Sequence, residues 1–510
     1  MKTLRLILGD QLNAQHSWYQ KTSESIVYLM VEIHQETSYV KHNIQKITAF
    51  FAAMRAFADT LIAQKHQVIY LKIQHPMARK PLDEMLNHFI NELSIDKFEY
   101  QEPDEYRLDA QLNHFCANLS IASECFSTEH FFTTRVELRD YFSGKKQWLM
   151  ESFYRHMRKK HQILMHGDAP LGGVWNFDHE NRKKYKGEHP VPPAIIFNND
   201  VSEIYREILS EKIDFFGNIN PEALSWPINR QQCLKQLTYF CQYLLEHFGD
   251  YEDAMHSREK YLFHARLSFA MNTKMLSPAE VIQKAIETFE QNTHKISLPQ
   301  IEGFVRQILG WREYVRGIYW AKMPEYQNLN YFNHENKLPA FFWTGQTQMN
   351  CLKNAIGQSL DDAYAHHIQR LMVIGNFSLL THLHPDAVDA WYLGVYIDAI
   401  EWVEMPNTRG MSQYADGGII ATKPYISSGS YIQKMSNYCV NCRYHVKEKT
   451  SEKACPFNSL YWNFLEVNRT YLQDNPRMSM MYHQLAKMPA EQRAQIRERA
   501  QKIIQNPDAF

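Results

Sequence analysis

Three of the chain's eight cysteines, Cys439, Cys442 and Cys455, stand close together near its C-terminal end. Their C-x2-C-x12-C-P spacing is typical of a metal or cluster site, because two thiolates separated by two residues reach the same centre. We expect Cys351, at a predicted loop-to-helix junction, to be the fourth ligand. His445 and the remaining cysteines are the alternatives. Zinc and a [4Fe–4S] cluster both accept four thiolates, so the spacing leaves the metal open.

A histidine pair, His366 and His367, is followed three residues later by Arg370. Histidine exchanges protons near neutral pH, so the pair is a candidate for acid–base chemistry. A His-His pair in a helix serves packing or hydrogen bonding more often than catalysis. The pair alone therefore does not decide between the two roles.

Length and composition indicate a globular protein of two or three domains. The chain has 510 residues, 45% of them hydrophobic, and a formal net charge of −1. With so little net charge, binding to nucleic acid requires a local basic patch. No apolar run approaches about 20 residues and no signal peptide is recognisable, so we expect a cytoplasmic protein that does not enter a membrane.

Five β-branched or apolar runs in the first part of the chain read as buried strands, at 4–8, 26–32, 67–73, 98–102 and 121–126. Amphipathic segments between them predict helices, and this alternation is typical of a parallel, doubly wound α/β sheet. Ligands of such sheets bind at the carboxyl ends of the strands, here 9–10 and 32–36. No G-x-G-x-x-G or Walker sequence follows either strand, so neither a dinucleotide nor a nucleoside triphosphate is indicated there.

The rest of the chain divides into two predicted regions. Residues 1–134 form the α/β domain, and 135–225 are rich in basic, aromatic, glycine and proline residues, which predicts a long basic linker over the surface. Such a run is usually a solvated face, and contacts to phosphates are the alternative. Residues 226–510 show helical patterning almost throughout, which predicts a large all-α domain.

Several segments together resemble the photolyase/cryptochrome superfamily. The resemblance extends over essentially the whole chain and is closest to the iron–sulfur bacterial branch, the prokaryotic (6-4) photolyases and their cryptochrome-like relatives. It rests on LILGDQL (6–12), AAMRAFA (52–58), WNFD (175–178), EGFVRQILGWREYVRGIYW (302–320), DAYAHHIQRLMVIGNF (362–377), WVEMPNTRGMSQYADGG (402–418) and the cysteine motif.

This resemblance implies an N-terminal antenna-binding α/β domain, a linker and an all-helical domain that binds FAD. It also implies a [4Fe–4S] cluster at Cys351, Cys439, Cys442 and Cys455, and a 6,7-dimethyl-8-ribityllumazine antenna at Asp10 and Glu36. The FAD-binding residues it implies are His264, Leu267, Ser268, Arg312, Arg370, Asp398 and Asn407. The first three lie in FHARLSF (263–269), where most of the hydroxyl residues common in the family are replaced.

The resemblance also assigns residues to repair. Moving a hydroxyl between two pyrimidines benefits from a proton donor, for which His367, with its neighbour His366, is the candidate. Leu371 stands where eukaryotic members have another histidine. Because a lesion must leave the duplex to reach a buried flavin, Tyr425 and the basic linker are expected to contact DNA. Trp343, Trp391 and Tyr431 are expected to carry electrons to FAD.

The expected function is light-driven repair of (6-4) photoproducts in UV-damaged DNA by a monomeric lyase, and we count a divalent cation such as Mg²⁺ among the cofactors to be tested. The alternatives are a cryptochrome-like blue-light receptor with the same cofactors and a zinc-stabilised nucleic-acid-binding module. Visible absorption separates the last from the first two, because FAD and an iron–sulfur cluster are coloured and zinc is not.

Overall fold

Five strands of the N-terminal region pair as one parallel sheet in the order β4-β2-β1-β5-β6. The computed structural model describes residues 1–510. The strands are β1 (Thr3–Leu6), β2 (Ile26–Val31), β4 (Gln67–Leu71), β5 (Lys97–Gln101) and β6 (Ala122–Phe126). In the register, Leu4 of β1 lies opposite both Val27 and Phe98. The chain starts in the middle and moves outward to both sides, which confirms the predicted doubly wound fold.

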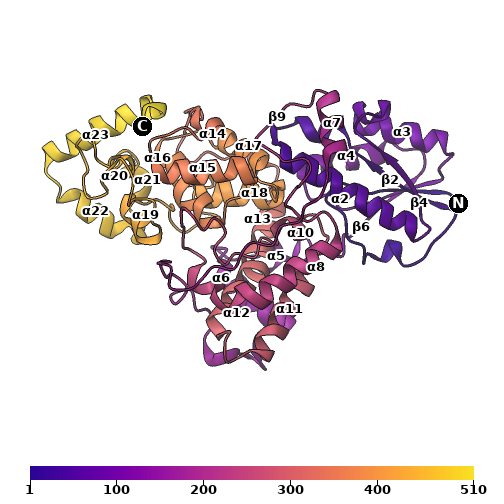
Figure 1. Ribbon diagram of the computed structural model, residues 1–510, viewed down its shortest axis with the longest axis horizontal. Helices are drawn as coiled ribbons and strands as arrows, with labels where there is room; N and C mark the ends of the chain where they lie inside the picture. The colour runs from indigo at the N-terminus through magenta and orange to yellow at the C-terminus, as the bar shows by residue number, and fades with distance from the viewer.

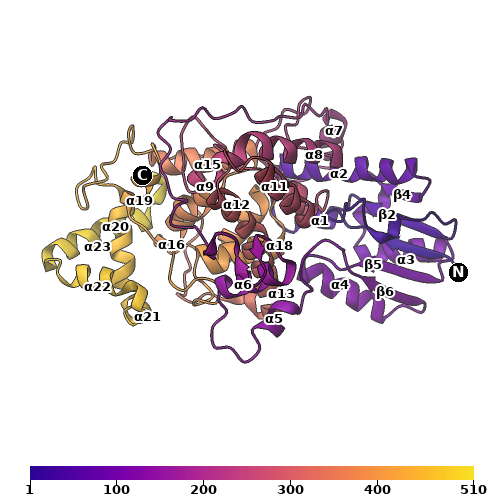
Figure 2. The same cartoon turned by 90° about the horizontal axis from the view of Figure 1, so that it is seen from below.

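Helices cover both faces of this sheet (Figures 1 and 2). Alternate residues of a strand point to opposite faces, so Leu29 belongs to the apolar cluster of α3 (Leu82–Glu92) and α4 (Tyr106–Ala117). Tyr28 and Met30 instead join the core that contains α2 (Ile44–Ala63). That core continues without a break from α2 into the helical part of the molecule, so α2 lies between the sheet and the second domain.

The segment predicted as a linker contains three helices, α5 (Glu137–Tyr141), α6 (Met150–His161) and α7 (Ser202–Ser210). Helix α6 packs against η5 (Arg306–Arg312) of the helical domain. Helix α7 packs against α2, where Arg55 pairs with the buried Glu207. The segment ends with β9 (Phe215–Phe216), which pairs with β3 (His42–Asn43). The linker thus returns to the first domain. The three domain ranges drawn from the sequence, 1–134, 135–225 and 226–510, stay a prediction.

The remainder is helical, as predicted (Figure 1). Four of its segments, η4 (Phe240–Leu244), η5, η7 (Gln369–Gly375) and η8 (Pro406–Ser412), are π-helical, a widened turn that is frequent at functional sites. The α-helices are α8 (Arg230–Tyr239), α9 (Leu245–Tyr251), α10 (Ser268–Asn272), α11 (Pro278–Gln291), α12 (Leu298–Val305), α13 (Glu313–Lys322), α14 (Phe341–Thr344), α15 (Asn350–Asp362), α16 (Asn376–Leu380), α17 (Pro385–Val395), α18 (Glu401–Met405), α19 (Gly429–Met435), α20 (Pro456–Val467), α21 (Arg469–Leu472), α22 (Ser479–Ala486) and α23 (Ala490–Gln505).

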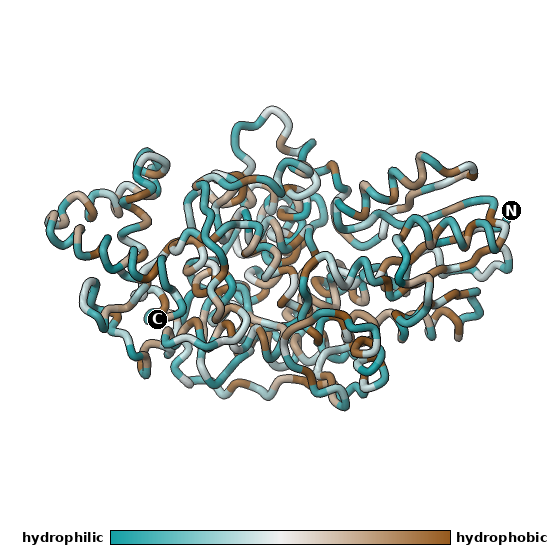
Figure 3. Tube along the Cα trace, turned by 90° about the horizontal axis from the view of Figure 1, so that it is seen from above, coloured by the Kyte–Doolittle hydropathy of each residue, from teal (hydrophilic) through white to brown (hydrophobic).

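The start of α2 joins the sheet to the helical domain. The Asn43 amide donates to the Leu360 carbonyl, 3.1 Å away, and caps α2 through its oxygen. Nearby, Gly394 of α17 lies so close to the Lys41 carbonyl that an added Cβ would be 2.1 Å from that oxygen. Only glycine allows this approach. Figure 3 shows apolar segments running through the middle of the molecule, where these parts meet. None of the helices combines the length and apolar character that crossing a bilayer requires.

A buried lysine links the two domains by charge. Lys274, just after α10, is 1% exposed, and its Nζ lies 2.8 Å from Asp10 Oδ2 and 2.6 Å from Asp104 Oδ2. Asp10 follows β1 and Asp104 follows β5, so both carboxylates stand at the carboxyl edge of the sheet. Burial raises the pKa of Asp10 to about 6, although the positive charge of Lys274 partly lowers it. Each of the two carboxylates therefore needs this one cation.

We predict that Lys274→Met lowers the free energy of unfolding by about 3–5 kcal/mol, because it leaves two buried carboxylates without their cation. The matched control is Lys72→Met, which removes an exposed lysine paired with Glu203 and Glu207 and should cost under about 1 kcal/mol. Chemical denaturation followed by tryptophan fluorescence measures both. Equal losses in the two variants would contradict a special role for Lys274.

Candidate functional site

A cavity of about 860 Å³ lies in the middle of the helical domain, with walls from α10, η5, η7 and η8. We call it the central cavity. Three of the four π-helical segments, η5, η7 and η8, contribute to it, so most of the widened turns gather at one site. Eleven residues selected from the sequence line it together: His264, Leu267, Ser268, Arg312, His366, His367, Arg370, Asp398, Asn407, Tyr425 and Tyr431. Its volume is in the range of cofactor pockets.

Two of these residues form a bidentate ion pair in the wall. Arg370 Nη1 and Nη2 lie 3.0 and 3.1 Å from the two oxygens of Asp398. Ser268 donates its hydroxyl to Asp398 Oδ2 over 2.5 Å. Both oxygens of Asp398 therefore have partners within the protein, and the carboxylate orients Arg370. Asn407 donates its amide to the Val403 carbonyl over 2.7 Å, and its amide oxygen makes no hydrogen bond within the chain.

The histidines form a stack in the cavity wall. His264 and His366 lie parallel, with ring centroids 4.5 Å apart and planes inclined by 13°. Burial, with His367 close by, lowers the pKa of His264 to about 4. The His367 side chain is exposed to the open cavity. The surrounding protein still removes much of its water, and this desolvation, together with the positive charge of Arg370, lowers its pKa to about 4. The histidines are thus neutral at pH 7.

Two arginines offer buried donors to the cavity. Arg312 is 8% exposed, and its Nη1 has no hydrogen-bond partner. Arg266 is 7% exposed, forms no ion pair with a carboxylate and has an unpartnered Nε. Its guanidinium lies over the rings of Trp226 and Tyr261, 4.7 and 4.1 Å from their centroids. Unpaired buried guanidinium groups in a cavity are suited to an anion such as a diphosphate.

Arg266 and Glu404 were missed by the reasoning from sequence. Arg266 stands inside the quoted FHARLSF segment, but its burial is not visible in the sequence. Glu404 lines the cavity at 6% exposure with an unpartnered Oε1, and burial raises its pKa well above the usual value. Burial thus favours the protonated form of this carboxyl. The only signal was the position of Glu404 inside WVEMP.

The tryptophans selected for electron transfer extend from the cavity wall towards the surface. Tyr392 lines the cavity, and its ring lies 5.4 Å from that of Trp391. Trp391 in turn lies 5.1 Å from Phe342, the neighbour of Trp343, whose ring is 41% exposed. Tyr431 also lines the central cavity, but its ring makes no aromatic contact with the members of this row.

A second, mostly apolar cavity of about 150 Å³ lies at the carboxyl edge of the sheet and contains both predicted antenna residues, Asp10 and Glu36. We call it the sheet-edge cavity. His42, also in its wall, is 3% exposed, and neither ring nitrogen makes a hydrogen bond. Ala399 lines both cavities, so they are adjacent. A ligand here would find an apolar slot with polar groups at its rim.

The four selected cysteines meet around one small pocket, the cysteine pocket, in the C-terminal part of the chain. Cys351 is the second residue of α15 and Cys455 is the N-cap of α20, and helix N-termini stabilise thiolates. Amides of Phe457 and Asn458 also point to the Cys455 sulfur, although burial raises the pKa of that thiol to about 12. The complete lining is Met349, Cys351, Gly429, Ile432, Tyr438, Cys439, Cys442, Tyr444, Val446, Cys455, Pro456 and Phe457.

The alternative fourth ligands lie elsewhere. The His445 ring pairs with Glu448 at the surface, 3.0 Å away, and does not line the pocket. No group of three or more His, Cys, Asp or Glu side chains has the spacing to bind a single metal ion. The four thiols thus surround a space without converging on one point.

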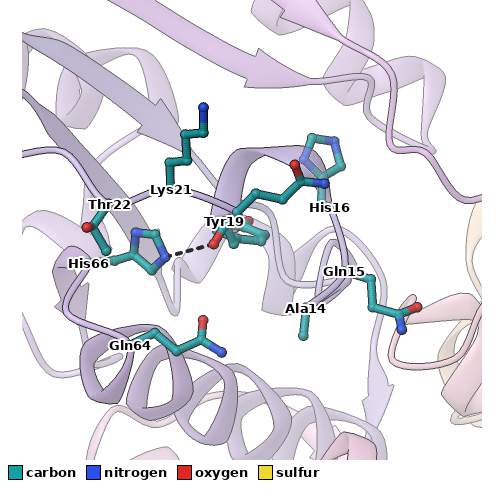
Figure 4. Close-up of a pocket in the computed structure, with 9 residues that line it drawn as sticks. Ala14, Gln15, His16, Tyr19, Lys21, Thr22, Gln64 and His66 are labelled. Atoms are coloured by element: carbon teal, nitrogen blue, oxygen red, sulfur yellow. Dashed lines mark hydrogen bonds between the residues drawn. The ribbon is translucent and has the colours of Figure 1, made fainter.

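One further hollow, open and polar, is formed by the loop 14–22 and the end of α2 (Figure 4). His66 lies there, with its Nε2 3.3 Å from the Tyr19 carbonyl. Because His66 directly precedes β4, the hollow stands at the amino edge of the sheet, opposite the edge where such sheets bind ligands. None of the predicted site residues lies in it.

Comparison with known proteins decides the family. A (6-4) photolyase of Agrobacterium fabrum is 39% identical over 515 residues and covers 100% of both chains. The chain belongs to the photolyase/cryptochrome family. A family model described as deoxyribodipyrimidine photo-lyase-related protein matches residues 5–224.

Two solved structures of family members share the fold. A class III photolyase from Agrobacterium tumefaciens aligns over 100% of this chain and 98% of its own, with a TM-score of 0.59 and 14% identity. A Synechocystis cryptochrome aligns over 98% of this chain and 99% of its own, with a TM-score of 0.58 and 12% identity. Both confirm the architecture of an α/β domain followed by a helical domain.

Membership in the photolyase/cryptochrome family implies FAD, and the central cavity fits it. The cavity has the volume for a cofactor. Its unpartnered guanidinium nitrogens on Arg266 and Arg312 match a diphosphate, and its apolar wall matches a flavin ring.

We predict that acid destabilises this photolyase-family protein through the buried histidines. In the unfolded chain His264 titrates near 6.5, whereas in the folded protein its pKa is about 4. Stability is full above pH 6.5 and falls as the pH drops towards 4, by about 1.4 kcal/mol per pH unit for this residue. His264→Phe, which keeps a ring against His366, should reduce this slope in denaturation curves taken from pH 7 to pH 4.5. The exposed His114→Phe is the control, and an equal slope in all three proteins would contradict the prediction.

Proposed function

We propose that the protein repairs (6-4) photoproducts in UV-damaged DNA in a light-dependent reaction, with FAD in the central cavity and His367 as proton donor. The observation that supports this most is the gathering of His366, His367 and Arg370 in the same cavity as the unpartnered guanidinium nitrogens of Arg266 and Arg312. The full-length similarity to a protein named (6-4) photolyase supports the same lesion.

When bound, reduced FAD supplies the electron that opens the lesion. The protein's task is to bind and orient. Arg266 and Arg312 hold the diphosphate, the Arg370–Asp398 pair and Ser268 form a polar wall, and Leu267 packs against the cofactor. The amide oxygen of Asn407 accepts a hydrogen bond from the flavin ring. The electrons that reduce FAD would pass along a row of rings, Tyr392, Trp391 and Trp343.

His367 has the position for proton transfer to the lesion. It lines the open part of the cavity, and its imidazole is not held by any hydrogen bond within the chain. Its pKa of about 4 keeps it neutral until an electron enters the lesion. The negative charge that then develops on the lesion raises the pKa of His367, so the imidazole takes up a proton from water in the open cavity and passes it to the hydroxyl that moves between the pyrimidines. His366, stacked on His264, holds the peptide from which His367 projects.

The mouth of the cavity is suited to a flipped nucleotide. Tyr425 and Tyr431 offer rings for stacking, and the basic residues around them attract backbone phosphates. The carboxylates in the same wall are the groups that a divalent cation such as Mg²⁺ would contact, together with DNA phosphate or water. The charged residues of this rim are Arg182, Lys423, Lys434 and Arg477, with Asp178, Glu252 and Asp253.

We further propose a [4Fe–4S] cluster at Cys351, Cys439, Cys442 and Cys455. The four cysteines line one pocket, and four thiolates are the ligand set of such a cluster. Gly429 supports this assignment, because an added Cβ there would lie 2.7 Å from Cys455 Sγ. The pocket thus has no room for a side chain at that position. Burial favours the neutral thiols. Coordination of the cluster and the N-termini of two helices favour the thiolates, which offsets this effect.

In the sheet-edge cavity we propose a lumazine antenna, 6,7-dimethyl-8-ribityllumazine. Apolar side chains form most of the slot, and Asp10, Glu36 and His42 are the polar groups available to the ring and the ribityl hydroxyls. The wall shared with the central cavity at Ala399 brings such an antenna next to FAD. Transfer of excitation energy from an antenna to FAD requires such a short separation between the two chromophores.

The function is tested with photoreduced protein and an oligonucleotide that contains one (6-4) photoproduct. We expect blue light to restore the thymines, and His367→Gln to slow repair by about 10²-fold or more while FAD remains bound. The exposed His114→Gln should repair like the unchanged protein. If the unchanged protein carries photoreduced FAD but restores no thymine in light, even with added Mg²⁺, repair is excluded and a photoreceptor role is favoured.

We also predict that Gly429→Ala lowers the iron content of purified protein and destabilises it by about 1–3 kcal/mol, because the methyl group collides with Cys455 Sγ. Gly357→Ala is the matched control. Gly357 lies in α15, the helix of Cys351, and an added Cβ there meets no atom within 4 Å. Iron analysis and the visible spectrum decide, and equal iron in both variants would contradict the assignment.

A further inference from the structure

A single tyrosine lies between the cysteine pocket and the residues behind the catalytic histidines. Tyr438 directly precedes Cys439, and its ring lines the cysteine pocket. Its carbonyl accepts a hydrogen bond of 2.7 Å from the side-chain amide of Asn350, the residue before Cys351. Tyr438 is 1% exposed. It is therefore fixed on both sides by segments that carry selected metal ligands.

On its far side, Tyr438 contacts Gln369. Gln369 Nε2 donates to the Tyr438 hydroxyl over 3.1 Å and to Gln358 Oε1 over 3.0 Å. Its Oε1 accepts the backbone N–H of His366 over 3.0 Å. Gln369 is 1% exposed and His366 is 3% exposed, so water does not replace these bonds.

The backbone N–H of His366 decides which way the Gln369 amide points, and the Tyr438 hydroxyl accepts from the NH₂ in that orientation. A glutamine amide has two donors and one acceptor group, and here each donor has an acceptor, Tyr438 or Gln358. If the amide were reversed, its NH₂ would face the N–H of His366, donor against donor. Gln358 is itself fixed, because its Nε2 donates to the Lys260 carbonyl over 3.3 Å. The network therefore allows one orientation.

We propose that Tyr438 and Gln369 are positioning residues that connect the cysteine site to the active-site histidines. The hydrogen bond from His366 to Gln369 fixes the backbone of the histidine pair, and with it the stack of His366 on His264 and the direction in which His367 projects. Occupation of the cysteine site fixes the position of Tyr438. The Tyr438 hydroxyl in turn holds the Gln369 amide in place by accepting its N–H. The proposal rests on the proposed function of His367, but its main test does not.

Hydrogen exchange of the peptide 363–370, which contains the His366 amide, is the main test. Holoprotein with Tyr438→Phe keeps the ring and loses the acceptor, so exchange at this peptide should accelerate by about three- to tenfold. The matched control is Tyr444→Phe, which also lines the cysteine pocket but whose hydroxyl makes no hydrogen bond within the chain. Equal exchange in Tyr438→Phe and Tyr444→Phe, at equal iron and FAD content, overturns the proposal.

A double-mutant cycle separates this chain of contacts from general loosening. Gln369→Leu removes the acceptor of the His366 N–H, so adding Tyr438→Phe to it should change exchange no further. Two additive effects would mean that Tyr438 acts by another path. Repair at saturating DNA should fall by about three- to tenfold in Tyr438→Phe with an unchanged KM. If the unchanged protein repairs nothing, the proposed function fails while the exchange result still decides on the network.

Discussion

The cation of Lys274 stands where water does not reach, between two carboxylates of the sheet and the start of the helical domain. Its charge needs those carboxylates, and they need it, so neither domain can place its half of the site alone. Asp10 belongs to the sheet-edge cavity, while α10, just before Lys274, carries Ser268 of the central cavity. The geometry of both cavities thus depends on this one buried contact.

The sequence was sufficient to predict the strands, the helical second domain and eleven of the residues that line the central cavity. Apolar runs separated by amphipathic segments determine a parallel sheet, because only that arrangement buries both faces. The family motifs placed His264, Arg312 and Asp398 correctly in one cavity. Cys351 was found through its position at a helix start, and it does share a pocket with the three clustered cysteines.

Other features depend on tertiary contacts that no local pattern contains. Arg266 and Glu404 are ordinary charged residues in the sequence, and only the fold shows that each is buried with an unpartnered atom. Asp398 stays a predicted flavin contact, and the sequence does not reveal that its oxygens also contact Arg370 and Ser268. The basic linker contains helices because its apolar residues pack on α2 and η5, far away in the chain.

Ala399 is part of both cavities, so a single methyl group belongs to two sites at once. The cavities therefore cannot evolve independently at this point. A larger side chain there would take space from both cavities in the same step. Selection on what binds in one cavity therefore acts on the other, which favours small residues at this wall and shifts variation to the outer rim of each cavity.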